Sequence, residues 1–400
     1  MPDRTTDILL IGGGVASAAA AHELRARGFA GGITLVGREL DPPYHRPPLT
    51  KEYLRGEQGR EQAHAHEEAW YEAGDIELLT RTSVTRLDTA GRVATLSTKD
   101  TVGYTSVLIA TGAMVRRLQV EGSELDGLHY LRAFGNADAI RADLDGAKDV
   151  VCVGGSYIGC EVAASLTALG HRVTVLMQED EPLERGFGTQ AGAWFRRVLE
   201  GHGVQVVGAD EVARFAGDGR VTHVVTAAGR QLPAQLVVLG VGVTPDVMLA
   251  RSAGLELGES GGIACDARLR TSADGVWAAG DVCEYDSVIH GRRIRVEHTE
   301  HAQAQGRYVA GAMLGDEQPF AVVPYFYSDL ADWASLEYVG PAQRWDEEVV
   351  RGSLDGGPFG IWYLEGGRVR GALSVDGALD LDAARELLVR GEVVTAAELP

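Results

Sequence analysis

Two short glycine-rich segments contain the residues whose types and spacing could do chemistry. They are Gly12-Gly13-Gly14-Val15-Ala16-Ser17 and Gly154-Gly155-Ser156-Tyr157-Ile158-Gly159. In the first, Gly12 would permit a tight turn, Gly14 would let a diphosphate approach the backbone, and Ser17 is small enough for a helix to pack closely on a strand. A helix that begins at such a turn offers free N–H groups and a positive dipole end to a phosphate. Each segment therefore predicts a site for a nucleotide diphosphate.

The elements expected around the first segment have the order of a dinucleotide-binding fold. Residues 8–11 (ILLI) are long enough for a buried strand of a parallel sheet, and residues 18–28 form an alanine-rich helical pattern. A second strand at residues 33–36 is followed by Glu39, which lies 27 residues beyond Gly12. Strand, glycine turn, helix, strand and acid is the order of that fold, and we expect Glu39 to accept hydrogen bonds from ribose hydroxyls.

The same order recurs around the second segment. Residues 150–153 are predicted as a strand, residues 160–170 as a helix and residues 171–177 as the next strand, followed by Gln178 and Glu179. An acid at this place pairs with a free ribose 2′-OH and repels a 2′-phosphate, so Glu179 favours NADH over NADPH. One such segment alone could be a structural turn without a ligand, but the recurrence favours a chain that binds two nucleotides.

Composition and charge exclude several classes of protein. The net charge is −20 at pH 7 with a pI near 5.0, which argues against binding to nucleic acid or to an anionic membrane surface. The 52 glycines of 400 residues have no triplet period and accompany only 13 prolines, which excludes collagen. No apolar run approaches the roughly 18 residues that a membrane helix needs. A soluble multidomain protein is expected.

Cysteine and histidine usage predicts neither a disulfide framework nor a metal site. The cysteines are too scattered for a redox dithiol or a zinc site, and we expect them to be buried in a reducing cytoplasm: Cys152, Cys160, Cys265 and Cys283. His298 and His301 lie three residues apart, but their segment has neither the HExxH nor the HxxEH spacing of zinc enzymes. We therefore expect a cytoplasmic protein without a metal.

Further motifs complete a resemblance to a known family. Residues 44–54 (YHRPPLTKEYL) are similar to the RPPLSK segment of the NADH-dependent ferredoxin or rubredoxin reductases that serve oxygenases and P450s, to which apoptosis-inducing-factor-like oxidoreductases are related. The resemblance covers nearly the whole chain. Its other elements are ATG at residues 110–112, AAGDV at 278–282, EHTEHAQAQGR at 297–307 and PYFYSDL at 324–330.

The resemblance implies an α/β fold with two Rossmann-like dinucleotide-binding domains and a C-terminal α+β domain. The FAD-binding domain would be discontinuous, with a first part at residues 1–113 and a second part at residues 243–318. The NADH-binding domain, residues 114–242, would be inserted between them. Alternating strand-like stretches and a final helix in residues 319–400 independently predict the separate α+β domain.

The resemblance also implies roles for single residues. Lys51 would lie by the flavin and pair with Glu161, and these two form the expected catalytic pair. A cation near flavin N5 favours the electron-rich reduced flavin, and a buried lysine needs a counter-charge. Asp281 would bind the ribityl chain. The other expected cofactor contacts are, for FAD, Gly12, Gly14, Val15, Ala16, Ser17, Glu39, Arg46, Ala110, Thr111, Gly112, Glu297, His298 and Thr299; for NADH, Gly154, Ser156, Tyr157, Ile158, Gly159 and Glu179; and, beside a nucleotide, Gly242.

Thr299 departs from the family pattern. Many members carry tryptophan at this position, after the glutamate–histidine pair. Threonine removes an aromatic neighbour of the flavin or nicotinamide that would stabilise a charge-transfer complex between reduced flavin and NAD.

The implied function is that of an NADH:ferredoxin reductase. It would oxidise NADH by hydride transfer to FAD and pass electrons singly to a [2Fe–2S] ferredoxin that feeds an oxygenase or P450. The missing dithiol favours direct transfer from flavin to acceptor. Two alternatives stay open: an apoptosis-inducing-factor-like NADH oxidase or quinone reductase, and a slow-turnover redox-sensing interaction protein. A monomer or homodimer is expected.

One basic cluster stands out on this acidic chain. Because ferredoxins are generally acidic, Arg292, Arg293 and Arg295 are candidates for docking a ferredoxin by charge complementarity. An exposed hairpin without a partner is the alternative interpretation of the same cluster.

Overall fold

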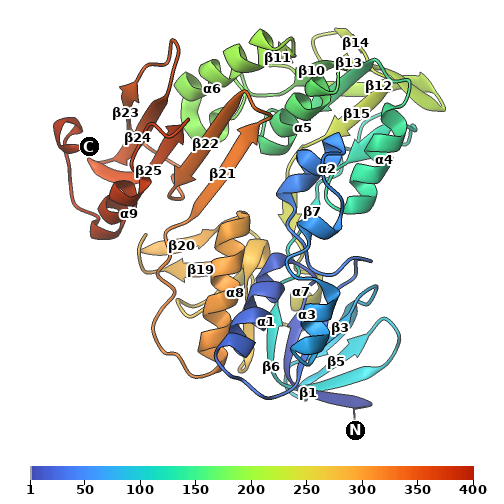
Figure 1. Cartoon of the computed structure of the whole chain (residues 1–400), viewed down its shortest axis with the longest axis vertical. Coiled ribbons are helices and arrows are strands. Elements are labelled where there is room, and N and C mark those ends of the chain that lie inside the picture. Colours follow the sequence, from blue (N-terminus) through green and yellow to red (C-terminus); the bar gives the residue numbers. More distant parts are fainter. Residues whose placement is uncertain (1) are drawn as a thin grey trace. The chain divides into compact units, whose positions relative to one another are not determined.

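The computed structural model describes residues 2–400, which divide into two compact units (Figure 1). Unit 1 comprises the chain up to His45, then Glu61–Met114 and Thr244–Phe326. Unit 2 comprises Arg46–Arg60, Val115–Val243 and Tyr327–Pro400. The short segment Arg46–Arg60 therefore packs with unit 2, which places Lys51 in the same unit as Glu161.

A seven-stranded sheet forms the centre of unit 1, with the order β3-β2-β1-β6-β5-β4 and β18 as a further partner of β6. β1, β2, β3, β6 and β18 pair in parallel, and β4, β5 and β6 pair antiparallel. Residues 8–11 are all buried, as expected for a central strand that is covered on both faces. The strands are β1 (Arg4–Ile11), β2 (Ile33–Val36), β3 (Ile76–Leu79), β4 (Val84–Asp88), β5 (Val93–Leu96), β6 (Thr101–Ile109) and β18 (Val276–Ala278).

Two long helices of unit 1, α1 (Val15–Ala26) and α8 (Thr299–Met313), lie side by side (Figure 1). Their close approach depends on Gly306, where an added Cβ would lie only 2.1 Å from the carbonyl oxygen of Ala16. The other elements of the unit are η2 (Glu61–Ala63), α3 (Glu68–Ala73), α7 (Met248–Ser252), η3 (Gly280–Val282) and the small sheet of β17 (Ile263–Cys265), β19 (Cys283–Ser287) and β20 (Arg292–Arg295).

Unit 2 contains a five-stranded parallel sheet with the order β11-β10-β9-β15-β8. Its strands are β8 (Leu128–Tyr130), β9 (Asp149–Val153), β10 (Arg172–Leu176), β11 (Gln205–Val207) and β15 (Leu236–Leu239). The associated helices are η1 (Pro47–Thr50), α2 (Glu52–Arg55), α4 (Phe134–Leu144), α5 (Tyr157–Ala168) and α6 (Glu184–Gly201). An antiparallel sheet is formed by β12 (Val212–Asp218), β13 (Arg220–Thr226) and β14 (Gln231–Pro233). β7 (Ala113–Val115) and β16 (Val243–Pro245), which contain the sequence boundaries of the units, form a two-stranded sheet.

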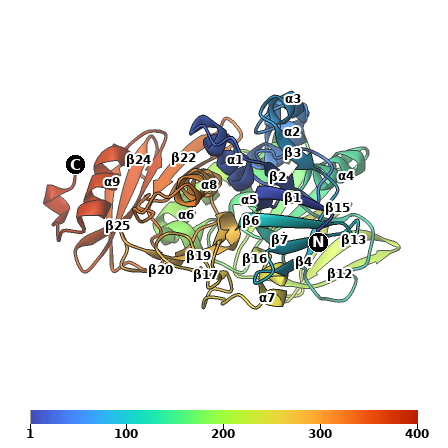
Figure 2. The ribbon, with the colours of Figure 1, turned by 90° about the horizontal axis from the view of Figure 1, so that it is seen from below.

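The last part of the chain forms a five-stranded sheet with the order β21-β22-β25-β24-β23, and α9 packs on β25 and β22 (Figure 2). Phe359, Trp362 and Tyr363 on β24 are fully buried, which gives this sheet its own core. Its elements are β21 (Tyr325–Leu330), β22 (Ala334–Val339), β23 (Glu347–Gly352), β24 (Phe359–Glu365), β25 (Arg368–Val375), α9 (Leu381–Arg390) and η4 (Ala396–Glu398).

The observed layers confirm the predicted fold class, since two sheets with parallel central strands each carry a glycine turn and an α+β part follows. Within residues 2–400, none of the helices has the length and apolar character that crossing a membrane requires.

Candidate functional site

The first glycine segment forms a turn with open space in front of a helix. Gly12 has φ +125°, and an added Cβ would lie 2.0 Å from the carbonyl oxygen of Ala110. Gly14 precedes α1 as its N-cap, and an added Cβ there would meet no atom within 4 Å. No side chain among residues 2–400 caps this end of α1, so its first N–H groups remain available to a ligand. This cradle fits the diphosphate of a dinucleotide.

Glu39 follows β2 and is oriented by a neighbour on the same loop. The hydroxyl of Tyr44 donates a hydrogen bond to the Glu39 carboxylate, and Tyr44 itself is buried. An acid fixed after the second strand of this fold can accept hydrogen bonds from ribose. Ser17 is fully buried on α1, so its side chain serves packing and only its backbone could face a nucleotide.

Three distant parts of the chain converge on the N-terminal end of α1. An added Cβ on Gly280 would lie 3.6 Å from the Cβ atoms of both Ala16 on α1 and Ala302 on α8. The backbone N–H of Gly280 donates to the side chain of Gln305 at 2.7 Å, which fixes η3 against α8. Asp281 is the next residue and is thereby held beside this point. The structure thus brings together residues that the sequence assigned to FAD from three separate motifs.

Thr111 and Gly112 lie at the end of β6 and are held by the backbone around Asp246. The Thr111 hydroxyl donates to the carbonyl oxygen of Asp246 at 2.7 Å, and the Asp246 N–H donates to the carbonyl oxygen of Gly112 at 2.9 Å. Gly112 has φ +70°, a conformation that favours glycine. Because the Thr111 side chain is engaged with Asp246, this segment could approach a cofactor only through its backbone. Ala110 is buried directly before it.

His298, the N-cap residue of α8, presents a buried polar atom without a protein partner. Its ring packs on Phe326 at a centroid distance of 4.2 Å, and its Nδ1 has no hydrogen-bond partner in the described part of the chain. Burial lowers the pKa of His298 to about 4, against the opposing charge of Asp281, so the ring is neutral at pH 7. An orphaned buried Nδ1 beside the open glycine cradle fits a site that a cofactor completes. Glu297 pairs with Arg295, and Thr299 begins α8.

His301, one turn further along α8, makes unit 1 sensitive to acid. It is 1% exposed, and burial lowers its pKa to about 3. The unfolded chain takes up a proton near pH 6.5, whereas the folded state resists it. The stability that neutral His301 permits is therefore fully present above pH 6.5, and it is lost progressively as the pH falls towards 3. We expect this histidine to reduce the free energy of unfolding by about 2 kcal/mol between pH 7 and pH 5.

Urea unfolding of wild type and His301→Gln at these two pH values measures this contribution. Between pH 7 and pH 5, the free energy of unfolding should fall by about 2 kcal/mol less in the glutamine variant than in wild type. Equal losses in the two proteins would contradict the buried neutral state of His301.

The second glycine segment repeats the turn geometry in unit 2. Gly154 has φ +109°, and an added Cβ would lie 2.3 Å from the carbonyl oxygen of Gly240. At Gly159 an added Cβ would lie 1.9 Å from the carbonyl oxygen of Gly154, so the helix can pack closely only with glycine there. Ser156 is the exposed N-cap of α5, and no side chain of residues 2–400 caps the helix. A second diphosphate cradle results. Gly242, with φ +93°, follows β15 on the same unit.

Glu179, the acid expected to bind the ribose hydroxyls, has a basic partner that the sequence analysis did not assign. Glu179 follows β10 and forms an ion pair with Arg185, whose side chain is 77% exposed in the first turn of α6. The ring of Tyr157 packs edge-on against Phe187 at a centroid distance of 5.9 Å, and burial raises the pKa of its phenol. Ile158 is half-buried beside it. The structure therefore places Arg185 next to Glu179, the acid expected to bind the ribose.

Lys51 and Glu161, the expected catalytic pair, are brought together in unit 2. Lys51 is 3% exposed, and its Nζ lies 3.6 Å from Glu161 Oε1 and 2.6 Å from Asp329 Oδ2. Thr50 Oγ1 lies 2.6 Å from Glu161 Oε2, and Ser328 Oγ lies 2.5 Å from Oε1. One buried cation thus meets two carboxylates, one of which is also held by two hydroxyls.

Burial and charge act in opposite directions on this cluster. Burial acts to lower the pKa of Lys51, but the charges of Glu161 and Asp329 outweigh it and hold the pKa above its ordinary value. Burial raises the pKa of Glu161, although Lys51 and the two hydroxyls oppose that effect. The ammonium of Lys51 is therefore charged throughout the physiological pH range, and Glu161 is the carboxyl that takes up a proton more readily than usual.

Sequence reasoning missed three members of this cluster: Thr50, Ser328 and Asp329. Ser328 and Asp329 belong to the PYFYSDL motif, which had been recognised only as part of the resemblance. A buried lysine requires a counter-charge, and this was the available signal. It could not single out Asp329, which lies 278 residues from Lys51.

The arginines considered for docking are less available than the sequence suggests. Arg293 pairs with Asp286 at 2.9 Å, and Arg295 pairs with Glu297. Their charges are therefore compensated within unit 1, which weakens the basic cluster as an attraction for an acidic partner. Arg46, expected to contact FAD, donates a hydrogen bond to the carbonyl oxygen of Arg132 in unit 2.

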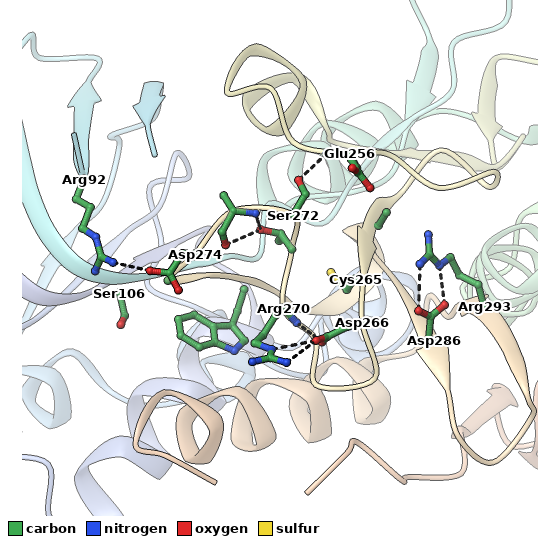
Figure 3. A pocket seen from close by; sticks show the side chains of 15 residues that line it. Arg92, Ser106, Glu256, Cys265, Asp266, Arg270, Ser272, Asp274, Asp286 and Arg293 are labelled. Atoms are coloured by element: carbon green, nitrogen blue, oxygen red, sulfur yellow. Dashed lines mark hydrogen bonds and ion pairs between the residues drawn. The ribbon is translucent and has the colours of Figure 1, made fainter. Parts of the chain in front are cut away.

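A hollow of about 660 Å³ lies in unit 1, away from the residues assigned to cofactors, none of which lines it (Figure 3). Its wall contains three ion pairs with N···O distances of 2.8 to 2.9 Å, Arg92–Asp274, Arg270–Asp266 and Arg293–Asp286. Because each of these arginines already faces a carboxylate, the hollow is not suited to an anionic nucleotide.

Comparisons with known proteins agree with this arrangement. The chain matches the family model described as pyridine nucleotide-disulphide oxidoreductase over residues 6–306 and the model described as reductase C-terminal over residues 325–400. It is 36% identical over 393 residues to the benzene 1,2-dioxygenase system ferredoxin–NAD(+) reductase subunit of Pseudomonas putida, covering 98% of this chain and 94% of that protein.

Two solved structures are similar along almost the whole chain. One is the ferredoxin reductase for the CYP199A2 system from Rhodopseudomonas palustris, with a TM-score of 0.93, 32% identity and coverage of 99% of this chain and 96% of that one. The other is the covalent putidaredoxin reductase–putidaredoxin complex, with a TM-score of 0.92, 31% identity and coverage of 97% and 94%. The chain belongs to the pyridine nucleotide-disulphide oxidoreductase family, which implies FAD and NAD(H) as its cofactors.

Proposed function

We propose that the protein is an FAD-dependent NADH:ferredoxin oxidoreductase that supplies a [2Fe–2S] ferredoxin serving an oxygenase or P450. The observation that carries this proposal is the similarity, along 97% or more of the chain, to reductases named for such systems, one of them solved in a complex with its electron carrier. Bound FAD would supply the redox chemistry, namely acceptance of a hydride from NADH and release of its electrons one at a time.

The residues of unit 1 proposed to hold FAD act by backbone geometry and hydrogen bonding. Gly12 and Gly14 form the turn that receives the diphosphate at the N-terminus of α1. Glu39, oriented by Tyr44, accepts hydrogen bonds from the ribose, and Asp281 accepts them from the ribityl hydroxyls. A neutral His298 is part of the same surface.

Four buried cysteines support direct electron transfer to an external acceptor. All four are free thiols. Burial raises the pKa of Cys152 to about 12 and raises the pKa values of Cys160 and Cys283 as well, so they lack the thiolate character of a redox cysteine. A disulfide-reducing member of the family needs a reactive dithiol, and these residues do not supply one.

We propose the following assignment of domains. Residues 1–113 and 243–318 form the FAD-binding domain, residues 114–242 the NADH-binding domain and residues 319–400 the C-terminal α+β domain. The glycine turns at Gly12 and Gly154 and the five-stranded sheet of β21 to β25 support this assignment.

The acidic residue at the second ribose predicts a change of cofactor preference. In Glu179→Arg, a guanidinium replaces the carboxylate that would bind the 2′-OH, and it joins Arg185 to favour a 2′-phosphate. We expect KM for NADH to rise about tenfold, as for the loss of about 1.4 kcal/mol of binding, and KM for NADPH to fall. Steady-state kinetics with both nucleotides checks this.

Gln178→Arg is the matched control, because it adds the same charge at the preceding exposed position. It should change the preference much less. An unchanged KM for NADH in Glu179→Arg would mean that the ribose site lies elsewhere.

Steady-state oxidation of NADH with different acceptors tests the proposed function. Fast turnover that requires a [2Fe–2S] ferredoxin is the expected result. Fast turnover with a quinone or oxygen alone would favour an oxidase or quinone reductase. Slow turnover with every acceptor, together with a long-lived charge-transfer band, would favour a redox sensor.

A further inference from the structure

Lysine is a rare residue in this chain, and only Lys51 is buried. We call Lys51 and its neighbours the Lys51 cluster; these neighbours are Thr50, Glu161, Ser328 and Asp329. Of the 37 basic residues, only Lys51, Lys99 and Lys148 are lysines, and the other 34 are arginines. Lys99 and Lys148 are exposed, whereas Lys51 is 3% exposed. A lysine ammonium is a compact point charge whose pKa responds strongly to its neighbours. The carboxylates that surround Lys51 therefore decide whether it is charged and where its Nζ lies.

The two carboxylates contact the ammonium in different ways. Asp329 Oδ2 lies 2.6 Å from Lys51 Nζ, the distance of a charge-assisted hydrogen bond. Glu161 Oε1 lies 3.6 Å away, beyond hydrogen-bond distance. Only the first contact fixes the direction in which an N–H of Lys51 points.

Each carboxylate is also held differently by its surroundings. Both oxygens of Glu161 already lie within 2.6 Å of a hydroxyl, those of Thr50 and Ser328. Glu161 is therefore fixed by α5 and its hydroxyl neighbours. The Asp329 side chain is 27% exposed and extends from β21 to Lys51. Since the Lys51 side chain is 4% exposed, water gives it little stabilisation, and the direct partner matters most.

We propose that Asp329 is a positioning residue of flavin reduction. Its carboxylate keeps the Lys51 ammonium charged and fixes the position of Lys51 Nζ. This rests on the proposed function, in which Lys51 acts on FAD. Asp329 would act through Lys51 and not through contact with a cofactor. Glu161, the carboxylate expected from the resemblance, would then be a second charge in the cluster.

Other charged or titratable groups face this cluster from the elements packed around it. On α5 they are Tyr157 and Cys160, next to Glu161. On β21 the Tyr327 ring lies 5.3 Å from Lys51 Nζ. On α2, Arg55 is within electrostatic reach of Asp329 but pairs directly with Glu57 at 2.7 Å and with Glu52 at 3.9 Å. Removing the Asp329 charge would thus leave Lys51 facing one close carboxylate.

The rarity of lysine permits a direct test on the FAD-loaded protein. Labelling with [ε-13C]lysine gives three side-chain signals, which Lys99→Arg and Lys148→Arg assign by elimination. In Asp329→Asn we expect the pKa of Lys51 to fall by about one unit or more, because an opposite charge in direct contact is removed while burial remains. In Asp329→Glu, which retains the negative charge, the pKa of Lys51 should stay close to that of wild type. Asp332→Asn, the same change on the exposed turn after β21, should leave it unchanged.

A second readout follows the reaction instead of the lysine. The alkaline limb of the rate of FAD reduction by NADH should move to lower pH in Asp329→Asn by the same shift as the Lys51 signal. If Asp329→Asn does not fold, Asp329→Ser provides the same comparison. A Lys51 titration equal to that of wild type in the folded variant would overturn the proposal. Neither readout involves ferredoxin. If ferredoxin proved not to be the electron acceptor, these two results would therefore be unaffected.

Discussion

Replacing Lys51 with methionine should slow the reduction of bound FAD by NADH by about 10- to 100-fold, which corresponds to about 1.4 to 2.8 kcal/mol in the activation barrier. Methionine keeps much of the side-chain volume but removes the cation proposed to favour electron-rich reduced flavin. It also leaves Glu161 and Asp329 without their shared counter-charge, so the pKa of the buried Glu161 should rise further. Stopped-flow absorbance of the flavin measures the rate.

Lys148→Met is the matched control, because Lys148 is exposed and the chemical change is identical. It should reduce FAD at the wild-type rate. FAD content and thermal stability of both variants distinguish an effect on the reaction from loss of the fold. Wild-type reduction kinetics in a Lys51→Met protein that retains FAD would remove Lys51 from the mechanism.

Alanine at the two turn glycines should separate the two nucleotide sites. In Gly12→Ala, the new Cβ would lie 2.0 Å from the carbonyl oxygen of Ala110 at a backbone with φ +125°. We expect at least about 100-fold weaker FAD binding, since strain and overlap of this kind cost about 3 kcal/mol. In Gly154→Ala, the Cβ would lie 2.3 Å from the carbonyl oxygen of Gly240, so NADH binding should weaken at least about tenfold while FAD stays bound.

The control for backbone strain is Gly28→Ala. Gly28 also has positive φ, +77°, but an added Cβ would meet no atom within 4 Å. It should cost about 1 kcal/mol of stability without changing affinity for either nucleotide. Fluorescence titration with FAD and KM for NADH measure the outcome. Loss of FAD in Gly154→Ala with retention in Gly12→Ala would reverse the assignment of the two sites.

The sequence was sufficient to predict the two nucleotide turns because their chemistry is local. Gly12 and Gly154 each lie directly between a buried strand and a helix, and both have the positive φ that a turn of this type requires. Buried parallel strands appear as continuous apolar runs, so β1 and β9 could be identified. The antiparallel strands β12 to β14 were not predicted, because strands with polar residues on an exposed face lack the continuous apolar run of a buried strand.

Partners within the site were less predictable, because they come from elements far apart in the chain. Asp329 contacts Lys51 across 278 residues, and neither spacing nor periodicity relates β21 to η1. Arg185 lies only six residues beyond Glu179, but its ion pair depends on how α6 begins. The resemblance named Glu161 as the counter-charge of Lys51, but nothing in the sequence indicated that Asp329 would be the carboxylate in direct contact with the ammonium.

Anaerobic rapid mixing of the NADH-reduced protein with an oxidised [2Fe–2S] ferredoxin tests the proposed electron transfer directly. We expect the flavin to be reoxidised while two molecules of this one-electron carrier are reduced for each NADH consumed. The transfer should persist after alkylation of any accessible thiol, since the four cysteines are buried. A flavin that stays reduced until oxygen or a quinone is admitted would contradict electron transfer from this protein to a ferredoxin.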